Sequence, residues 1–219
     1  METVFETENV RLIQGDCREV IPTLSGVDCV ITDPPYGIRM DTKIHESCGR
    51  VQYDSMIGDE ETLDLRFLWE SFPLCVVFGA NNFTEQLPRG GGWIVWDKRS
   101  PSGVADEMFG WPFELAWTSV PKLGRMIRVQ HGGYLNADKA NARREHPTQK
   151  PVRLMAKCME AVRVPIRATV LDPFCGSAST LIAALETGRK SIGIEISEEY
   201  CAVAKRRLER WHAQERLNL

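Results

Sequence analysis

The run Val27-Asp28-Cys29-Val30-Ile31-Thr32 is mostly apolar and ends abruptly at Asp33-Pro34-Pro35-Tyr36. The run predicts a buried strand, which the prolines must end because they lack a backbone N–H group. The residue before a proline is held in extended geometry, so Asp33 and Tyr36 lie on a stiff turn. Beyond the carboxyl end of a strand in an open α/β sheet, such side chains face the ligand crevice and can hold a planar group with an exocyclic amine. A proline-stiffened surface turn is the structural alternative.

Similar runs recur along the chain and alternate with the apolar spacing of helices. Strands and helices in alternation indicate a mostly parallel sheet with helices on both faces. The predicted strands at 113–119 and 125–130 are expected to form an antiparallel pair. A polar stretch at 37–58 predicts a long loop, and a helix is expected over 60–72. The other predicted strands span 10–14, 74–78, 93–96, 169–171 and 190–196, and the other main helices span 147–164, 177–187 and 197–211.

Length and composition predict one globular domain that resides in the cytoplasm. The 219 residues are 43% hydrophobic and 26% charged, as in ordinary globular proteins. No apolar run approaches the roughly 18 residues of a membrane span, and the acidic start is unlike a signal peptide. The seven cysteines are odd in number and never spaced C-x-x-C, so they predict buried thiols of a reducing compartment, with neither disulfides nor zinc. The histidines show no metal-ligand spacing.

The net charge of −3 hides an uneven distribution. Residues 41–70 carry eight acidic and three basic side chains, whereas residues 121–153 carry eight basic and two acidic ones. Because local clustering matters more than total charge for a polyanionic partner, the basic segment is a candidate nucleic-acid surface. A solvated loop that binds nothing is the alternative. The candidate side chains are Lys122, Arg125, Arg128, Lys139, Arg143 and Arg144.

A second motif, at residues 171–180, reads Leu-Asp-Pro-Phe-Cys-Gly-Ser-Ala-Ser-Thr. Gly176 permits close approach of a ligand to the backbone, and Ser177 is placed to cap the helix that follows. Glu195 ends the next predicted strand, 19 residues after Gly176, and an acid at that distance commonly holds a ribose hydroxyl pair. The sequence lacks the glycine-rich patterns that bind phosphate chains. The motif therefore predicts a nucleoside ligand without a phosphate chain. The alternative is a structural turn with a surface Glu and no ligand.

Four sequence blocks together resemble the amino-group DNA methyltransferases. They are Asp33-Pro34-Pro35-Tyr36, His146-Pro147-Thr148-Gln149-Lys150-Pro151, the D-P-F-x-G-S block at 172–177, and Glu195. The resemblance implies S-adenosylmethionine as cofactor, double-stranded DNA as partner, and methylation of adenine N6 or cytosine N4. It implies a Rossmann-like, mostly parallel seven-stranded sheet in the permuted order of the family's β group. The single domain, 1–219, would comprise a catalytic half at 10–131, a basic loop at 120–146 and a cofactor half at 146–212.

The resemblance also implies roles for individual residues. Asp33 and the Pro34 carbonyl would accept hydrogen bonds from the target amine, and Tyr36 would stack on the base. Pro35 completes this catalytic set. Lys150 would supply a counter-charge to the methionine carboxylate of the cofactor. Around the rest of the cofactor the resemblance places Asp16 on the adenine, Glu195 on the ribose, and Asp172, Phe174, Gly176, Ser177, His146 and Thr148 nearby.

Two departures from the family pattern bear on these roles. Ala178 stands where the family usually has Gly, so a β-carbon enters the cofactor loop and is expected to weaken binding. The family's target-recognition domain is reduced to the basic segment, which should project from the same side of the sheet as Asp33. A chain this compact is expected to form a homodimer to cover its site.

Several readings of the function stay open at the level of sequence. Adenine N6 leads, because cytosine N4 members more often carry Ser in place of Asp33. Cytosine methylation by the same machinery is the nearest alternative. An RNA amino-methyltransferase and a nucleic-acid-binding protein without catalysis are further ones, and pairing with a restriction enzyme is not decided by the residues.

Overall fold

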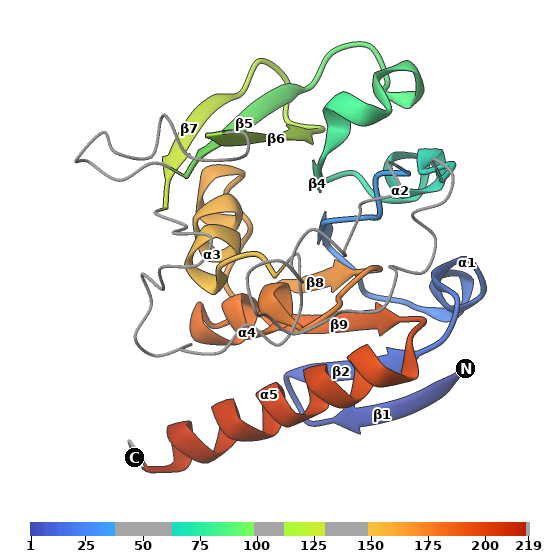
Figure 1. The fold of residues 1–219 in the computed structure, drawn as a ribbon, viewed down its shortest axis with the longest axis vertical. Helices are drawn as coiled ribbons and strands as arrows, with labels where there is room; N and C mark the ends of the chain where they lie inside the picture. Colours follow the sequence, from blue (N-terminus) through green and yellow to red (C-terminus); the bar gives the residue numbers. More distant parts are fainter. Residues whose placement is uncertain (38–62, 99–111, 130–148, 218–219) are drawn as a thin grey trace, which may run out of the picture.

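The computed structural model describes residues 1–37, 63–98, 112–129 and 149–217. The elements alternate along the chain much as the sequence predicts (Figure 1). The strands are β1 (Glu2–Glu6), β2 (Val10–Gln14), β3 (Cys29–Thr32), β4 (Cys75–Phe78), β5 (Gly92–Asp97), β6 (Phe113–Thr118), β7 (Gly124–Arg128), β8 (Thr169–Asp172) and β9 (Lys190–Glu195). The α-helices are α1 (Cys17–Val20), α2 (Arg66–Ser71), α3 (Val152–Ala161), α4 (Ser179–Glu186) and α5 (Glu198–Leu217). Short 3-10 turns span Ile21–Thr23, Ala80–Asn82 and Thr84–Gln86.

In the described part of the chain, the strands form one nine-stranded sheet of order β1-β2-β9-β8-β3-β4-β6-β5-β7. β1 pairs antiparallel with β2, and β6 pairs antiparallel with both β4 and β5. All other neighbouring pairs are parallel. The mostly parallel α/β sheet is therefore confirmed; it has nine strands, where the family resemblance implied seven and the sequence pattern predicted eight segments. The added N-terminal strand, β1, went unpredicted because its charged, half-exposed residues lack an apolar pattern.

The expected pairing of 113–119 with 125–130 is wrong, because β5 lies between β6 and β7. The short link from β6 to β7 crosses the start of β5, where the Trp93 N–H donates to the Leu123 carbonyl at 2.7 Å. A β-carbon built on Gly92 would lie 2.4 Å from that same carbonyl oxygen. Glycine at this position thus allows the link to pass against β5, so that β7 can pair with the free side of that strand.

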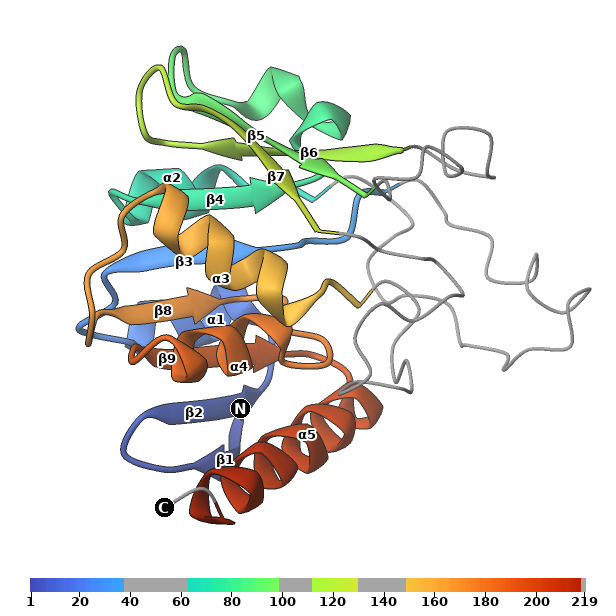
Figure 2. The ribbon, with the colours of Figure 1, turned by 90° about the vertical axis from the view of Figure 1, so that its left-hand side faces the viewer.

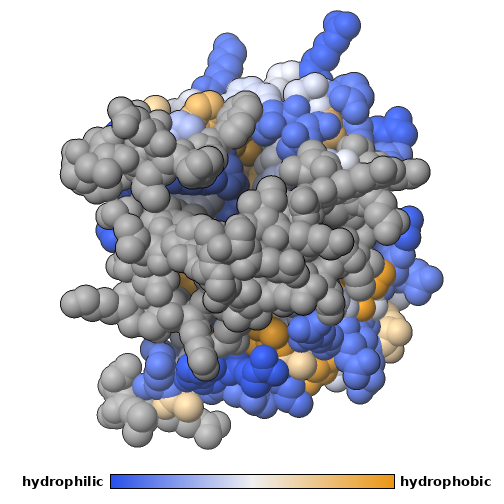
Figure 3. Space-filling view, viewed as in Figure 1, coloured by the Kyte–Doolittle hydropathy of each residue, from blue (hydrophilic) through white to orange (hydrophobic). Residues whose placement is uncertain are grey.

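Helices cover both faces of the sheet, as expected, because successive strand residues point to opposite sides. In β4, Val76 and Phe78 pack with α3 and α4, whereas Val77 packs with Leu68 of α2 on the other face. In Figure 1, α3 and α4 lie on one side of the strands and α1 and α2 lie on the other. Each face of the sheet thus has a hydrophobic core that contains fully buried aliphatic and aromatic side chains. The described surface in Figure 3 is largely hydrophilic, and no described helix is both long and apolar enough to span a membrane.

The predicted main helices are confirmed with changed bounds: the helix expected over 197–211 extends to Leu217, whereas the others are shorter. The helix expected over 60–72 comprises Arg66–Ser71, and the helix expected over 147–164 begins only at Val152, after Pro151. Ser197 caps α5, because its hydroxyl accepts from the Tyr200 N–H at 3.3 Å. The loop expected at 37–58 lies almost wholly outside the described residues.

Candidate active site

The carboxyl ends of neighbouring parallel strands bring the motif residues to one edge of the sheet (Figure 2). Asp33 follows β3, Gly79 follows β4, and Asp172 and Glu195 end β8 and β9. β6 runs in the opposite direction, so Glu114, its second residue, lies at this same edge. Residues far apart in the sequence therefore meet around the end of β3, which we call the carboxyl edge.

Both carboxylate oxygens of Asp33 accept hydrogen bonds. The Tyr36 hydroxyl donates to Oδ1 at 2.5 Å, and the Lys150 ammonium donates to Oδ2 at 2.5 Å. The side chain of Lys150 is 7% exposed and that of Asp33 is 16% exposed. Charge-assisted bonds of this length fix the orientation of the carboxylate before any ligand binds.

The expected role of Lys150 as a counter-charge to the methionine carboxylate of the cofactor stays a prediction. In the structure, its ammonium pairs with the predicted catalytic carboxylate of Asp33. The reason is the packing of α3 against β3, which brings the residues just before α3 to the end of that strand. Lys150 thus joins the catalytic cluster.

Glu114 adds a second carboxylate to this cluster, and the sequence analysis missed it. Its Oε2 lies 3.1 Å from the Lys150 nitrogen, and its Oε1 lies 2.5 Å from the Lys98 nitrogen. Nothing in the run Phe113–Thr118 distinguishes this Glu from a solvent-facing strand residue. Only the antiparallel pairing of Glu114 with Trp96 places it at the carboxyl edge.

Burial and charge act against each other in the cluster. Burial raises the pKa of Asp33, and the Lys150 ammonium opposes that rise. Burial would lower the pKa of Lys150, but Asp33, Tyr36 and Glu114 hold it well above its ordinary value. Burial would likewise raise the pKa of Glu114, but Lys150 and Lys98 lower it to about 2. Burial, together with Asp33, keeps the pKa of Tyr36 well above its ordinary value, so its phenol stays neutral.

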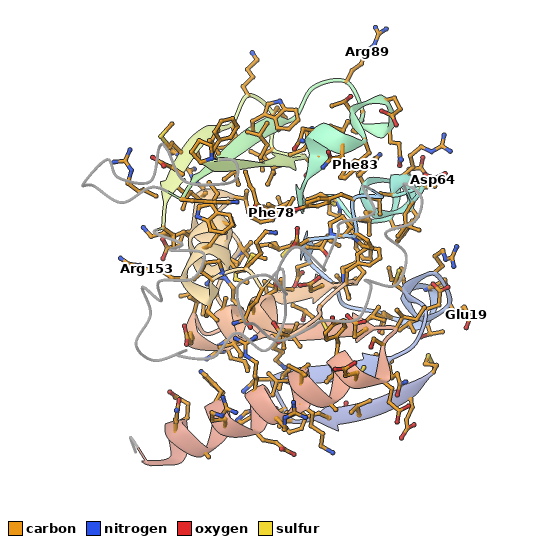
Figure 4. All side chains as sticks on the ribbon, viewed as in Figure 1. Glu19, Asp64, Phe78, Phe83, Arg89 and Arg153 are labelled. Carbon is orange, nitrogen blue, oxygen red and sulfur yellow. The ribbon has the colours of Figure 1, made fainter. Side chains whose placement is uncertain are left out.

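Two residues of β4 and its turn shape the space around Tyr36. Gly79 has φ +69°, and a β-carbon built there would lie 2.0 Å from Cε1 of the Tyr36 ring. Phe78 is fully buried and points into the interior in Figure 4. The Lys150 nitrogen lies 5.8 Å from the Tyr36 ring centroid and 5.5 Å from the Phe78 centroid, both within cation–π range. Aromatic faces therefore help to hold the buried ammonium.

At the end of β9, the carboxylate of Glu195 receives two backbone donors. Gly176 donates to Oε2 and Ser197 donates to Oε1, each at 2.9 Å. Burial raises the pKa of Glu195, and the N–H groups of Ser197 and Gly176 oppose that rise. The glycine turn after β8 is thus tied to the carboxylate at the end of the next strand.

Asp172 links this turn to the strand that carries Asp33. Its Oδ1 accepts from the Thr32 hydroxyl at 2.6 Å and from the Phe174 N–H at 3.2 Å. Thr32 is the last residue of β3, directly before Asp33. Asp172 is 3% exposed, and burial raises its pKa to about 6.

The end of the glycine turn corrects one expectation. Ser177 does not cap α4; the N-cap is Ala178, which makes no side-chain hydrogen bond there. Arg207, from α5, instead donates to the Ser177 hydroxyl at 2.9 Å and also to the Ser177 carbonyl. Ala178 has φ +65°, a left-handed conformation that costs about 1–2 kcal/mol for a residue with a β-carbon. Arg207 could not be singled out in the sequence, because it lies within a long charged helix.

Asp16 is the second residue beyond β2 and caps α1. Its carboxylate accepts from the Arg18 N–H at 2.9 Å and pairs with the Arg18 guanidinium, which lowers the pKa of Asp16. β2 pairs with β9, so Asp16 lies at the carboxyl edge near Glu195, where the Gly15 N–H donates to the Glu195 carbonyl at 2.9 Å. Among the described residues, no group of three or more acidic, His or Cys side chains is placed to hold a metal.

Comparison with known proteins establishes the family. The sequence model described as DNA methylase, of the N6 and N4 type, matches residues 126–206. Over 210 residues the chain is 32% identical to the protein named "Putative methylase YubD" of Escherichia coli strain K12, covering 90% of this chain and 89% of that protein. The chain belongs to the amino-group DNA methyltransferase family. This methyltransferase is also 48% identical over 64 residues to the DNA adenine methyltransferase YhdJ of the same strain, covering 29% of this chain and 21% of YhdJ.

The fold of the methyltransferase is shared with a solved structure. The crystal structure of the M1.HpyAVI–SAM complex superposes with a TM-score of 0.59 and 24% sequence identity. The match covers 91% of this chain and 98% of that one. The Rossmann-like fold expected from the sequence is thus confirmed.

The predicted DNA-binding residues of the methyltransferase are spread along the sheet. Lys122 lies in the link between β6 and β7, at the edge opposite Asp33, and Arg125 lies at the start of β7 near that edge. Arg128 ends β7 at the carboxyl edge, where its Nε lies 2.9 Å from the Asp97 carboxylate. The expected projection of the basic segment beside Asp33 is therefore wrong for Lys122 and Arg125. Lys139, Arg143, Arg144, His146 and Thr148 lie outside the described residues.

Proposed function

We propose that this methyltransferase transfers a methyl group from S-adenosylmethionine to the exocyclic N6 amine of an adenine in double-stranded DNA. The observation that carries the proposal is the oriented Asp33 carboxylate, held by Tyr36 and Lys150 at the carboxyl edge. The Thr32–Asp172 hydrogen bond joins this carboxylate's strand to the glycine turn. This hydrogen bond supports the proposal, because it connects the proposed amine acceptor to the residues proposed to hold the cofactor.

The choice of adenine rests on Asp33 itself. An ionised carboxylate accepts hydrogen bonds from an NH₂ group more strongly than a serine hydroxyl does. The partial likeness to an adenine methyltransferase agrees with this choice. Methylation of cytosine N4 remains the second candidate, because the same acceptors suit both amines.

The residues at the end of β9 fit S-adenosylmethionine. The Glu195 carboxylate suits a ribose hydroxyl pair, and the next residue, Ile196, exposes 50% of its apolar surface beside it. We infer that Asp16, Asp172, Phe174, Gly176, Ser177 and Glu195 hold the cofactor, with His146 and Thr148 from the following block. When bound, S-adenosylmethionine supplies an electrophilic sulfonium methyl group.

Asp33 contributes to the reaction by changing the amine. The lone pair of an exocyclic amine is delocalised into the ring, so the nitrogen is a poor nucleophile. Hydrogen bonds from the NH₂ group to Asp33 and to the Pro34 carbonyl favour a localised lone pair. As positive charge develops on nitrogen, the attraction to Asp33 grows, and the transition state gains more than the ground state. Tyr36 and Pro35 shape the site that receives the base.

The base must leave the duplex to reach Asp33, at a cost of a few kcal/mol. We propose that Arg128 and the basic residues Lys139, Arg143 and Arg144 hold the DNA backbone near the carboxyl edge. Lys122 and Arg125 lie toward the opposite edge of the sheet, and we propose that they contact a more distant part of the duplex. A homodimer and a cytoplasmic location are further proposals; the six described cysteines are all buried thiols, which agrees with a reducing compartment.

Methylation-sensitive sequencing of DNA from a host that expresses the protein tests the proposal directly. We expect N6-methyladenine at one recurrent sequence, and its loss with Asp33→Ala. That variant should bind the cofactor within a few-fold of wild type in calorimetry but transfer methyl at least ~100-fold more slowly. Methylcytosine at recurrent sites would favour the second candidate, and transfer to matched RNA alone would overturn DNA as the substrate. Cofactor binding without any transfer would indicate a binding protein.

A further inference from the structure

Lys150 lies between two carboxylates that it contacts unequally. Its ammonium donates a hydrogen bond to Asp33 Oδ2 at 2.5 Å, whereas Glu114 Oε2 lies 3.1 Å away. That Glu114 oxygen is buried, yet it accepts no well-aligned hydrogen bond from the described residues. A buried acceptor without a donor is costly, and a lysine carries three donors. Glu114 is therefore a second carboxylate, already in ion-pair contact, toward which the Lys150 ammonium can shift.

Each oxygen of Asp33 already accepts one short hydrogen bond, so an entering amine must share Asp33 with its two present donors or displace one of them. Tyr36 occupies Oδ1 and Lys150 occupies Oδ2. The Tyr36 ring is held against the backbone of Gly79, so it has little freedom to withdraw. Lys150 ends a flexible four-carbon stem, and a second carboxylate is already within its reach. Lys150 is thus the donor that can leave.

We propose that Lys150 moves from Asp33 to Glu114 when the target amine enters, and that Glu114 is a positioning residue that receives it. The inference rests on the proposed amine methylation and adds a residue to it. Transfer between two carboxylates keeps the ammonium paired throughout. An unpaired ammonium at this depth would be strongly destabilising.

The surrounding charges favour this movement. Lys98 lies 2.5 Å from Oε1 of Glu114 and keeps that carboxylate ionised in either position of Lys150. While Lys150 is paired with Asp33, it offsets part of the negative charge of that carboxylate. With Lys150 displaced, Asp33 attracts the positive charge developing on the amine more strongly. The other described titratable groups that act on Asp33 or its neighbours are Tyr36 and Asp172.

Glu114→Gln tests the inference, because it preserves the shape of the side chain and removes its charge. Single-turnover methyl transfer to unmethylated genomic DNA should slow about 10-fold or more, as expected for loss of a buried charge partner. Affinities for DNA and for the cofactor should stay within about twofold. Glu114→Asp, which keeps the charge, should restore part of the rate. Glu160→Gln removes an exposed charge from α3 and serves as the matched control.

The pH dependence of the rate gives a second readout. Transfer needs ionised Asp33, so the rate falls on the acid side. Removing the cation with Lys150→Met should move this acid limb to higher pH, because burial then raises the pKa of Asp33 with only the Tyr36 hydrogen bond opposing it. Glu114→Gln removes a nearby anion and should move the limb to lower pH while the plateau falls. A purely structural role for Glu114 would lower the plateau without these opposite shifts.

The double variant completes the test. In the Lys150→Met background there is no ammonium for Glu114 to accept, so Glu114→Gln should lower the plateau of the rate no further. Independent effects in the double variant, or a wild-type rate in Glu114→Gln, would overturn the inference while the proposed function stands. An inactive wild type would overturn both. If Glu114→Gln fails to fold, Glu114→Asp decides: an intermediate rate supports the inference, and an unchanged rate and acid limb refute it.

Discussion

Gly79→Ala should disable the catalytic cluster without altering any charge. The added β-carbon would start 2.0 Å from Cε1 of Tyr36, and ordinary contact begins near 3.4 Å, so the ring must retreat by about 1.4 Å. That retreat breaks the 2.5 Å bond from the Tyr36 hydroxyl to Asp33. Displacement of a catalytic group by about 1 Å can cost about 100-fold in rate. We expect a loss of that order in single-turnover methyl transfer, measured with labelled S-adenosylmethionine.

Gly26→Ala is the matched control, because Gly26 has φ +72° but no atom within 4 Å of a built β-carbon. Both variants incur the left-handed backbone cost of about 1–2 kcal/mol in unfolding free energy. Overpacking should add about 1–3 kcal/mol for Gly79→Ala alone. Urea unfolding measures both values. A wild-type rate in Gly79→Ala, or an equal loss of rate in Gly26→Ala, would refute the role given to the Tyr36 contact.

Three further predictions concern the proposed cofactor site. Glu195→Gln should weaken S-adenosylmethionine binding about 10-fold in calorimetry and leave DNA affinity unchanged; an equal loss of both would make Glu195 structural. Asp172 has a raised pKa of about 6 against 3.8 unfolded, so its contribution to stability is present below pH 3.8 and lost as pH rises through 6, a change of ~3 kcal/mol. Asp172→Asn should remove this fall from urea unfolding measured between pH 4 and 7. Arg207→Met should free the Ser177 turn and lower cofactor affinity several-fold, whereas Arg206→Met, on the exposed side of α5, should not.

The sequence predicts the parts of this fold that depend on short-range pattern. The apolar runs that lead to Asp33 and to Asp172 both form strands that end at the carboxyl edge. Strand order depends on contacts between distant segments, which explains the error at the last strands. The position of β5 between β6 and β7 depends on a backbone crossing at Gly92, and a glycine run by itself predicts only a turn.

The same distinction holds for the active site. Asp33 and Tyr36 come together as predicted, because they share one turn. Glu114 joins them through the direction of β6, and Lys150 through the docking of α3 on β3. A local sequence motif predicts neither the direction of a strand in the sheet nor the position at which a helix packs on it. The contacts made by such long-range geometry, Glu114 and the pairing of Lys150 with Asp33, are the ones that sequence reasoning missed.

The sheet order also sets when the protein can become active during synthesis. The strands β9 and β8 lie between β2 and β3 in the sheet, although β2 and β3 precede them by more than a hundred residues in the sequence. Until the ribosome has released residues 169–195, β2 and β3 have no partners on their facing edges. The nascent chain must therefore wait with two open strand edges, a state prone to aggregation and suited to chaperone binding. For the same reason, two fragments cut between the halves should fold only when produced together.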